Sequence, residues 1–267
     1  MHWILQENMF QESEWLNIIQ TLEKLELPFS VHKVVPFVGE LDPPVALDTT
    51  NVICMGSYSM RHFACQNGWY PGVFDLFEQN FEVQKQHWGE LMLNFDSHVV
   101  PFALAKFEGT AFIRPIDDSK HFAGRLIDGD EMAVWQEKVV ALGENQSNGL
   151  DANTLIQVSS NKKIFAEYRY WVVNGEIVTK SLYKQGNRVV YSPIVDERFD
   201  VFVNKAIAIW QPHDAFVIDV CDTSDGIKIV EINTINSAGF YAGDMSKLVV
   251  ALEVFNAEQN TTPKLRV

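Results

Sequence analysis

The stretch F-V-I-D-V-C-D-T-S-D-G-I-K-I-V-E-I-N, Phe216 to Asn233, has the pattern of one β-hairpin that carries a group of oxygen donors. Its two runs are rich in Val and Ile, and T-S-D-G between them favours a turn. Because side chains alternate along a strand, Glu231 and Asn233 share one face, and Asp219 lies on the neighbouring strand near the same end. Two carboxylates and an amide oxygen are ligands that Mg²⁺ accepts when substrate phosphates complete its octahedron. A solvated acidic face of a hairpin has the same pattern, so this stretch alone leaves both interpretations open.

Composition limits the class of protein. The chain has 267 residues, 47% hydrophobic and 21% charged, which is ordinary for one large globular domain or two modest ones. A net charge of −14 argues against broad contact with nucleic acid. Three cysteines without metal-ligand spacing indicate reduced thiols. No signal peptide or apolar run of about 20 residues is visible, so we expect a cytoplasmic protein without a membrane span.

The pattern of elements divides the chain into two parts and a tail. Strands and helices alternate over residues 1–106, which predicts a small α/β lobe. Residues 107–256 predict an antiparallel sheet with packed helices, and residues 257–267 a polar tail. The predicted fold class is therefore α+β. The expected strands span 3–6, 29–35, 51–55, 110–114, 155–158, 164–173, 176–183 and 189–191, and the expected helices begin near Ser13 or span 81–93, 130–142, 197–210 and 244–255.

A strand followed by a polar loop carries two cations. The strand delivers Arg114, and the loop over 115–124 carries Lys120. A guanidinium and an ammonium placed in this way suit a polyphosphate. The loop is not a Walker A motif, and no G-x-G-x-x-G occurs in the chain. A solvated hairpin tip would account for the charges of the loop equally well.

A second hairpin places two further cations close together. Asn174-Gly175 is typical of a type I′ turn, and pairing through it puts Arg169 opposite Lys180. Like charges across a ladder are unfavourable unless an anion lies between them. Such a local conflict tends to mark a functional site. Alternatively, both side chains extend into solvent or pair with nearby glutamates.

The order of these segments resembles that of the ATP-grasp enzymes. An R-P strand with a lysine-bearing loop is followed by a strand ending in Q-V-S, an E-Y-R hairpin, and D…E-x-N before N-S-A-G-F-Y. The pattern is most similar to the clade named for two arginines and a lysine, many of whose members occur in bacteria and phages. The resemblance covers about 112–252, and the first lobe is similar to the small pre-ATP-grasp domain.

The resemblance implies roles for the nucleotide-binding residues. Arg114 would contact the α- and β-phosphates of ATP, where the family usually has lysine. Lys120 would lie in a flexible loop that closes over the triphosphate. The backbone of Gln157, Val158 and Ser159 would form the hinge that binds adenine.

It also implies the catalytic side of the site. Arg169 would contact the γ-phosphate or the acyl substrate, with Lys180 nearby, so that Arg169, Lys120 and Lys180 form the catalytic set. Mg²⁺ would be held by Asp219, Glu231 and Asn233. The segment 236–239 would shape the acceptor side, where many members have a Pro-Gly pair.

The implied activity is an ATP- and Mg²⁺-dependent carboxylate–amine or carboxylate–thiol ligase that forms an acyl phosphate. Its partners would be ATP, a carboxylate-bearing small molecule or peptide, and an amine acceptor, with an amino acid, peptide or protein terminus as substrate. A kinase-like phosphotransferase on the same fold and a non-catalytic nucleotide-binding module are the alternatives. The departures at Arg114 and at residues 236–239, and the lack of a glycine-rich phosphate loop, leave the acceptor open.

Overall fold

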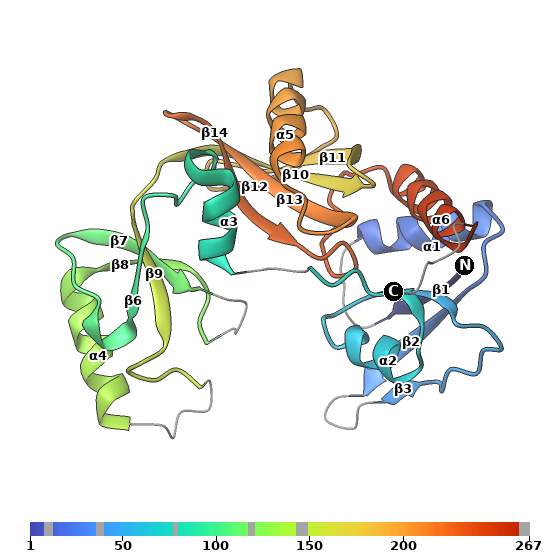
Figure 1. The fold of residues 1–267 in the computed structure, drawn as a ribbon, viewed down its shortest axis with the longest axis horizontal. Helices are drawn as coiled ribbons and strands as arrows, with labels where there is room; N and C mark the ends of the chain where they lie inside the picture. Colours follow the sequence, from blue (N-terminus) through green and yellow to red (C-terminus); the bar gives the residue numbers. More distant parts are fainter. Residues whose placement is uncertain (8–12, 36–39, 77–79, 117–120, 143–148, 262–267) are drawn as a thin grey trace. The chain divides into compact units, whose positions relative to one another are not determined.

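The fold is known from a computed structural model, which describes residues 1–7, 13–35, 40–76, 80–116, 121–142 and 149–261. The chain forms two compact units. The first consists of Met1–Phe77, Ala166–Val220 and Glu231–Val267, and the second of Glu78–Phe165 and Cys221–Val230. The polypeptide therefore enters the second unit twice, and neither unit is continuous in sequence (Figure 1).

The first unit begins with a five-stranded sheet of order β3-β2-β1-β4-β5. Its pairs are parallel except for β2 with β3. The sheet confirms the predicted alternation of strands and helices. The two edge strands β3 and β5 were not predicted, because three residues are too few to show alternation. The elements are β1 (His2–Gln6), α1 (Ser13–Lys24), β2 (Phe29–Val35), β3 (Glu40–Asp42), β4 (Asn51–Met55), α2 (Met60–Gln66) and β5 (Tyr70–Gly72).

A second five-stranded sheet has the order β12-β11-β10-β13-β14. Asn174 and Gly175 have φ of 51° and 78°, which confirms the predicted type I′ turn between β10 and β11. The hairpin over 216–233 is also confirmed. Figure 1 shows α5 against this sheet. The elements are β10 (Ile164–Val173), β11 (Glu176–Gln185), β12 (Arg188–Ser192), α5 (Glu197–Ile209), β13 (Ala215–Thr223), β14 (Gly226–Asn233) and α6 (Met245–Thr261).

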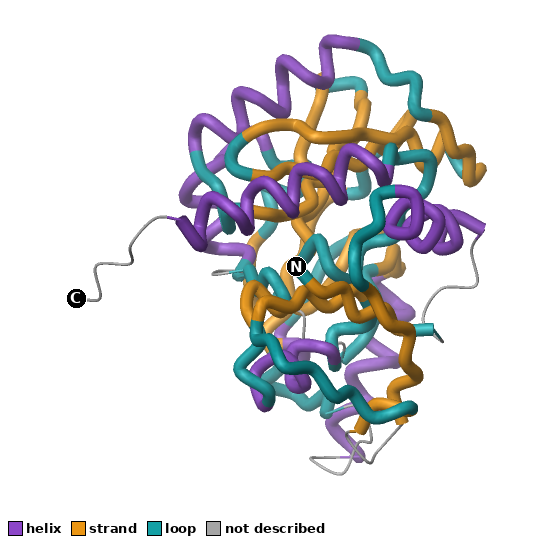
Figure 2. Tube along the Cα trace, turned by 90° about the vertical axis from the view of Figure 1, so that its right-hand side faces the viewer, coloured by secondary structure: helices purple, strands orange, loops and turns teal. Residues whose placement is uncertain are grey.

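One hydrophobic core joins the two sheets of the first unit. Trp3 and Leu5 from β1 lie in the same buried cluster as Trp171 from β10 and Leu248 from α6. Figure 2 shows the helices in purple and the strands in orange from a second direction. Helix α6 runs to Thr261, beyond its predicted end at residue 255. The continuation contains neither Gly nor Pro, so nothing in it ends a helix.

The second unit contains an antiparallel four-stranded sheet of order β6-β9-β7-β8. Trp135 of α4 packs edge-on against Phe102 and Phe122 beside this sheet. The predicted helix over 81–93 ends earlier, because Gly89 has a φ of 50°. No helix in the described ranges combines the length and apolar character needed to span a bilayer. The elements are α3 (Phe81–Trp88), η1 (Gly89–Leu91), β6 (His98–Pro101), η2 (Phe102–Leu104), β7 (Thr110–Pro115), β8 (Arg125–Asp128), α4 (Gly129–Leu142) and β9 (Leu155–Ser160).

Candidate functional site

A buried ion pair lies on the second sheet of the first unit. Arg169 of β10 donates from Nε to Oδ1 of Asp219 at 2.8 Å and from Nη2 to Oδ2 at 2.7 Å. Its Nη1 donates to the carbonyl oxygen of Gly239 at 3.3 Å. Arg169 is 6% exposed and Asp219 1% exposed. The two-point geometry fixes the guanidinium relative to the carboxylate.

Negative charge gathers around this pair. Burial raises the pKa of Asp219 to about 6, Arg169 opposes that rise, and the carboxylates of Glu231 and Glu167 add to it. Asn233 donates from Nδ2 to Oε1 of Glu231 at 3.2 Å. The structure therefore brings the three predicted metal ligands into one neighbourhood, which contains three carboxylates.

This donor set suits Mg²⁺. Carboxylates and an amide oxygen are hard ligands, and a divalent cation would offset the repulsion among the acids. Among the described residues, no group of three or more His, Cys, Asp or Glu side chains is arranged to hold a metal. A cation at Asp219, Glu231 and Asn233 would therefore need further ligands, such as water or substrate phosphates.

The predicted pairing of Arg169 with Lys180 is wrong. A register shift between Trp171 and Val172 places Lys180 opposite Tyr170, and Arg169 opposite Ser181. Adjacent residues of a strand point to opposite faces, so Lys180 lies on the face away from Arg169. The turn at 174–175 could not reveal this shift, because a bulge adds a residue without a turn signal.

Lys180 has a partner on the α5 face of the sheet. Its Nζ donates to Oδ1 of Asp200 at 2.6 Å, and the hydroxyl of Tyr170 donates to the same oxygen at 2.9 Å. The expected conflict between like charges does not exist, because each cation is paired with its own acid. The register also contradicts the expectation that Lys180 lies near Arg169.

A second register shift concentrates side chains on Glu167. The shift lies between Glu167 and Tyr168. The Tyr183 hydroxyl donates to Oε2 of Glu167 at 2.9 Å, and Nζ of Lys184 donates to Oε1 at 2.5 Å. Burial, together with Asp219 and Glu167, raises the pKa of Tyr183, so the phenol remains a donor. The roles of Tyr183 and Lys184 were missed from the sequence, because regular alternation would put them on opposite faces.

The loop after β14 is anchored by Asn236. This residue is 2% exposed, and its Nδ2 donates to the carbonyl oxygen of Cys54 at 2.7 Å. Its Oδ1 accepts from the backbone nitrogen of Phe74 at 2.8 Å. The side chain of Asn236 thus links β4 and the chain after β5 to the loop at 234–239. Gly239, at the end of this loop, reaches Arg169 through its carbonyl oxygen.

The predicted nucleotide-binding residues lie in the second unit, whereas Arg169, Asp219, Glu231 and Asn233 lie in the first. Arg114 is half-buried near the end of β7, opposite Gln157 of β9. Lys120 lies outside the described residues. The hinge residues Gln157, Val158 and Ser159 are buried in β9, the strand between β6 and β7.

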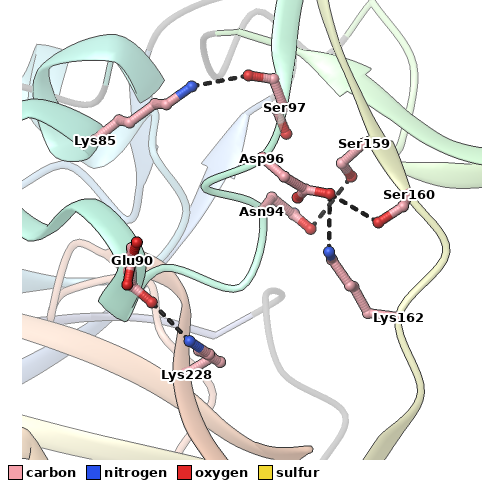
Figure 3. Close-up of polar contacts among 9 residues, drawn as sticks. All are labelled: Lys85, Glu90, Asn94, Asp96, Ser97, Ser159, Ser160, Lys162 and Lys228. Carbon is pink, nitrogen blue, oxygen red and sulfur yellow. Dashed lines mark hydrogen bonds and ion pairs between the residues drawn. The ribbon is translucent and has the colours of Figure 1, made fainter. Parts of the chain in front are cut away.

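The end of β9 is fastened by side chains of the segment Asn94–Ser97, here called the strap. The ladder with β6 ends at Val158, whereas the ladder with β7 continues to Ser160. Beyond the β6 ladder, the Ser159 hydroxyl donates to Oδ1 of Asn94 at 3.3 Å and the Ser160 hydroxyl to Oδ2 of Asp96 at 2.7 Å (Figure 3).

Lys162 completes this arrangement, donating from Nζ to Oδ2 of Asp96 at 2.8 Å (Figure 3). Burial alone would raise the pKa of Asp96, but the hydrogen bonds from Lys162 and Ser160 outweigh it and hold the pKa below its usual range. The strap therefore ties the predicted hinge to the start of β6.

Comparisons with known proteins identify the family. The model for family 3 of the ATP-grasp clade named for two arginines and a lysine matches residues 58–252, so the chain belongs to this ATP-grasp family. No curated protein matches the chain.

Solved structures agree on the fold. A RimK domain ATP-grasp protein from Sphaerobacter thermophilus is 12% identical with a TM-score of 0.63, over 97% of this chain and 98% of that chain. D-alanine–D-alanine ligase from Bacillus anthracis complexed with ATP is 12% identical with a TM-score of 0.60, over 97% and 98%. The ATP-grasp ligase PsnB complexed with a phosphomimetic variant of its minimal precursor, Mg and ADP is 10% identical with a TM-score of 0.54, over 96% and 97%. At these identities the likeness establishes the ATP-grasp fold, which confirms the prediction from the sequence.

Proposed function

We propose that the protein is an ADP-forming, ATP- and Mg²⁺-dependent ligase that joins a carboxylate to an amine. The observation that carries this proposal is the Arg169–Asp219 pair among Glu231, Glu167 and Asn233, within a chain of the ATP-grasp family. Two structural neighbours, D-alanine–D-alanine ligase and PsnB, are described as ligases, which supports this reaction class.

The metal role in this proposal belongs to Asp219, Glu231 and Asn233. Bound there, Mg²⁺ would neutralise charge on the phosphates of ATP. Arg114 and Lys120 would hold the phosphate tail, and the backbone at 157–159 would hold adenine. The catalytic role predicted for Lys180 is not carried into the proposal, because Lys180 lies on the α5 face of the sheet.

Arg169 is suited to act on the transferred group. In the described part of the chain, three of its five N–H groups donate to Asp219 and Gly239, and the remaining two are available to an anionic oxygen. The substrate carboxylate would attack the γ-phosphorus of ATP, forming a carboxyl–phosphate bond as the bond to ADP breaks. Fixed positive groups stabilise the charge spread over the phosphoryl oxygens during this step.

The second step forms the product. The acceptor amine attacks the activated carbonyl carbon, phosphate leaves, and the amine loses a proton. The acyl phosphate would otherwise react with water, so enclosure of the site matters for yield. Lys120, in the loop between β7 and β8, is proposed to contribute to that enclosure.

Product analysis tests the reaction class. The purified chain is incubated with ATP, Mg²⁺ and mixtures of amino acids and dipeptides, and the products are separated by mass spectrometry. We expect ADP, phosphate and an amide in equal amounts. A stable phosphoester would instead support phosphotransfer, and nucleotide binding without turnover of any acid would support a binding module.

The metal role is tested by Glu231→Gln, which keeps the shape of the side chain and removes its charge. Calorimetry with ATP should show that added Mg²⁺ strengthens binding to the wild type and does so much less in Glu231→Gln. Asp225→Asn, an exposed change in the turn of the same hairpin, is the control and should behave as the wild type. Equal Mg²⁺ dependence in all three proteins would remove the role assigned to Glu231.

A further inference from the structure

Three tyrosines from separate segments form a continuous aromatic surface, here called the tyrosine wall. Tyr183 of β11 stacks on Tyr241 with ring centroids 5.0 Å apart and planes 20° apart. Tyr191 of β12 lies 5.1 Å from Tyr241 at 31°. The outer member, Tyr191, is 39% exposed, so the wall extends from the interior to solvent.

The tyrosine wall adjoins the Arg169–Asp219 pair. The guanidinium of Arg169 lies 4.8 Å from the ring centre of Tyr241 and 5.7 Å from that of Tyr183. A Cβ added to Gly239 would lie 3.3 Å from the Tyr241 ring and 3.7 Å from Nη1 of Arg169, so the glycine permits this close packing. The wall therefore already holds one planar cation beside the candidate site.

Two local irregularities of the backbone build the wall. Tyr241 has a φ of 48°, a left-handed conformation that a bulky residue rarely adopts. Tyr183 lies at the register shift that lets both it and Lys184 reach Glu167. Strained backbone persists where surrounding structure enforces it, and it is concentrated at binding and catalytic sites.

The charges near the wall favour a cationic ligand. Glu167 accepts from the Tyr183 hydroxyl, and Glu231 and Glu167 both act on Asp219. The face of a tyrosine ring attracts a cation, and nearby carboxylates add to that attraction. A neutral aliphatic side chain would gain from neither effect.

We propose that the tyrosine wall selects the amine acceptor and favours one that carries a guanidinium or ammonium side chain, such as a basic amino acid or a peptide with a basic residue. Tyr191 and Tyr241 would contact the side chain of the acceptor, and Tyr183, held by Glu167, would support Tyr241. This inference rests on the proposed ligase function, because it assigns the acceptor of that reaction.

Calorimetry with two matched probes tests the inference. L-argininamide and L-citrullinamide have nearly the same shape, but only the first carries the guanidinium charge. Each is titrated into the full chain, with and without ATP and Mg²⁺. We expect the wild type to bind argininamide roughly two- to fivefold more tightly, the range of a partly exposed cation–π contact. Equal binding, no binding of either probe, or tighter binding of phenylalaninamide would overturn the proposal.

Variants assign the preference to the wall. Tyr191→Ala should remove most of the preference for argininamide, and Tyr191→Phe should retain it, since the ring remains. Tyr70→Ala is the control, because Tyr70 is 40% exposed, close to the exposure of Tyr191. A preference that survives in Tyr191→Ala would assign it to the carboxylates and contradict the role of the wall.

The two proposals fail in different ways. ATP binding is measured on the same samples without any probe. A chain that binds no ATP contradicts the ligase function, whereas a chain that binds ATP and Mg²⁺ but does not distinguish the probes contradicts only the role of the wall.

Discussion

Arg169 and Asp219 illustrate how single residues depend on each other in this molecule. Both side chains are buried, and each supplies the countercharge that the other has lost from water. A buried pair contributes little net stability compared with an apolar pair of the same size, but an unpaired buried charge is costly. Each residue therefore constrains what can be substituted at the other.

Arg169→Met should lower the free energy of unfolding by about 3–5 kcal/mol, because it leaves Asp219 buried without its partner. Urea unfolding in EDTA measures this loss. The double variant Arg169→Met with Asp219→Leu should lose less than the sum of the two single variants, since no charge is then left unpaired. Additive losses would mean that the two residues act independently.

The same variant should respond to pH. Burial raises the pKa of Asp219 to about 6 with Arg169 present, and removal of the guanidinium takes away the interaction that opposes the rise. A carboxyl whose pKa is higher in the folded chain stabilises the fold while protonated, and this contribution is lost as pH rises through the folded pKa. Arg169→Met should therefore be closer to the wild type in stability at about pH 5 than at about pH 8. A difference that does not change between these pH values would contradict the assignment.

Among the elements, the strap has the clearest testable role. Asp96 accepts from Ser160 and Lys162, so the end of β9 is held by a charged hydrogen-bond group. If the backbone there binds adenine, loosening this end should weaken nucleotide binding and leave the chemistry in place.

Lys162→Met should raise KM for ATP roughly three- to tenfold with little change in kcat, because a charge-assisted bond of about 1 kcal/mol is lost at the hinge. Lys163→Met is a matched control, since the Lys163 ammonium lies 5.6 Å from the ring centre of Phe165 and, among the described residues, makes no hydrogen bond with the strap. Steady-state kinetics on both variants makes the comparison. A change in kcat alone, or the same effect from Lys163→Met, would contradict the positioning role.

The elements also show where prediction from sequence succeeds. The turn at Asn174-Gly175 and the hairpin over 216–233 were predicted, because turn residues and Val- and Ile-rich strands are local signals. The pairing of Arg169 with Lys180 failed, since the shift between Trp171 and Val172 depends on packing across the sheet. The metal-ligating trio could be predicted from alternation along a hairpin. Tyr183, Tyr191 and Tyr241 could not be linked, because they come from three separate segments.

At the scale of the whole molecule, the first unit combines segments that are far apart in the sequence. Asn236 connects them directly, bonding to Cys54 and Phe74 across more than 160 positions. The predicted division at residue 106 followed changes of texture along the chain and stays a prediction. The compact units follow contacts instead, which a linear pattern does not reveal.

Asn236→Ala should lower the free energy of unfolding by about 2–3 kcal/mol, because it leaves the Cys54 carbonyl and the Phe74 amide buried without this partner. Urea unfolding followed by tryptophan fluorescence measures the change, and Ser237→Ala at the neighbouring position is the control. Trp3 and Trp171 share one core, so the loss should appear as a shift of a single transition. A separate early transition of the first sheet would contradict this coupling.

The extra residue between Trp171 and the turn has an evolutionary consequence. Removing one codon within 176–179 would restore the pairing that the turn alone dictates and would carry Lys180 across the sheet to the side of Arg169, while side chains further along β11 would change sides with it. In this family a single deletion, rather than a substitution, can therefore redistribute charge between the two sides of the catalytic sheet.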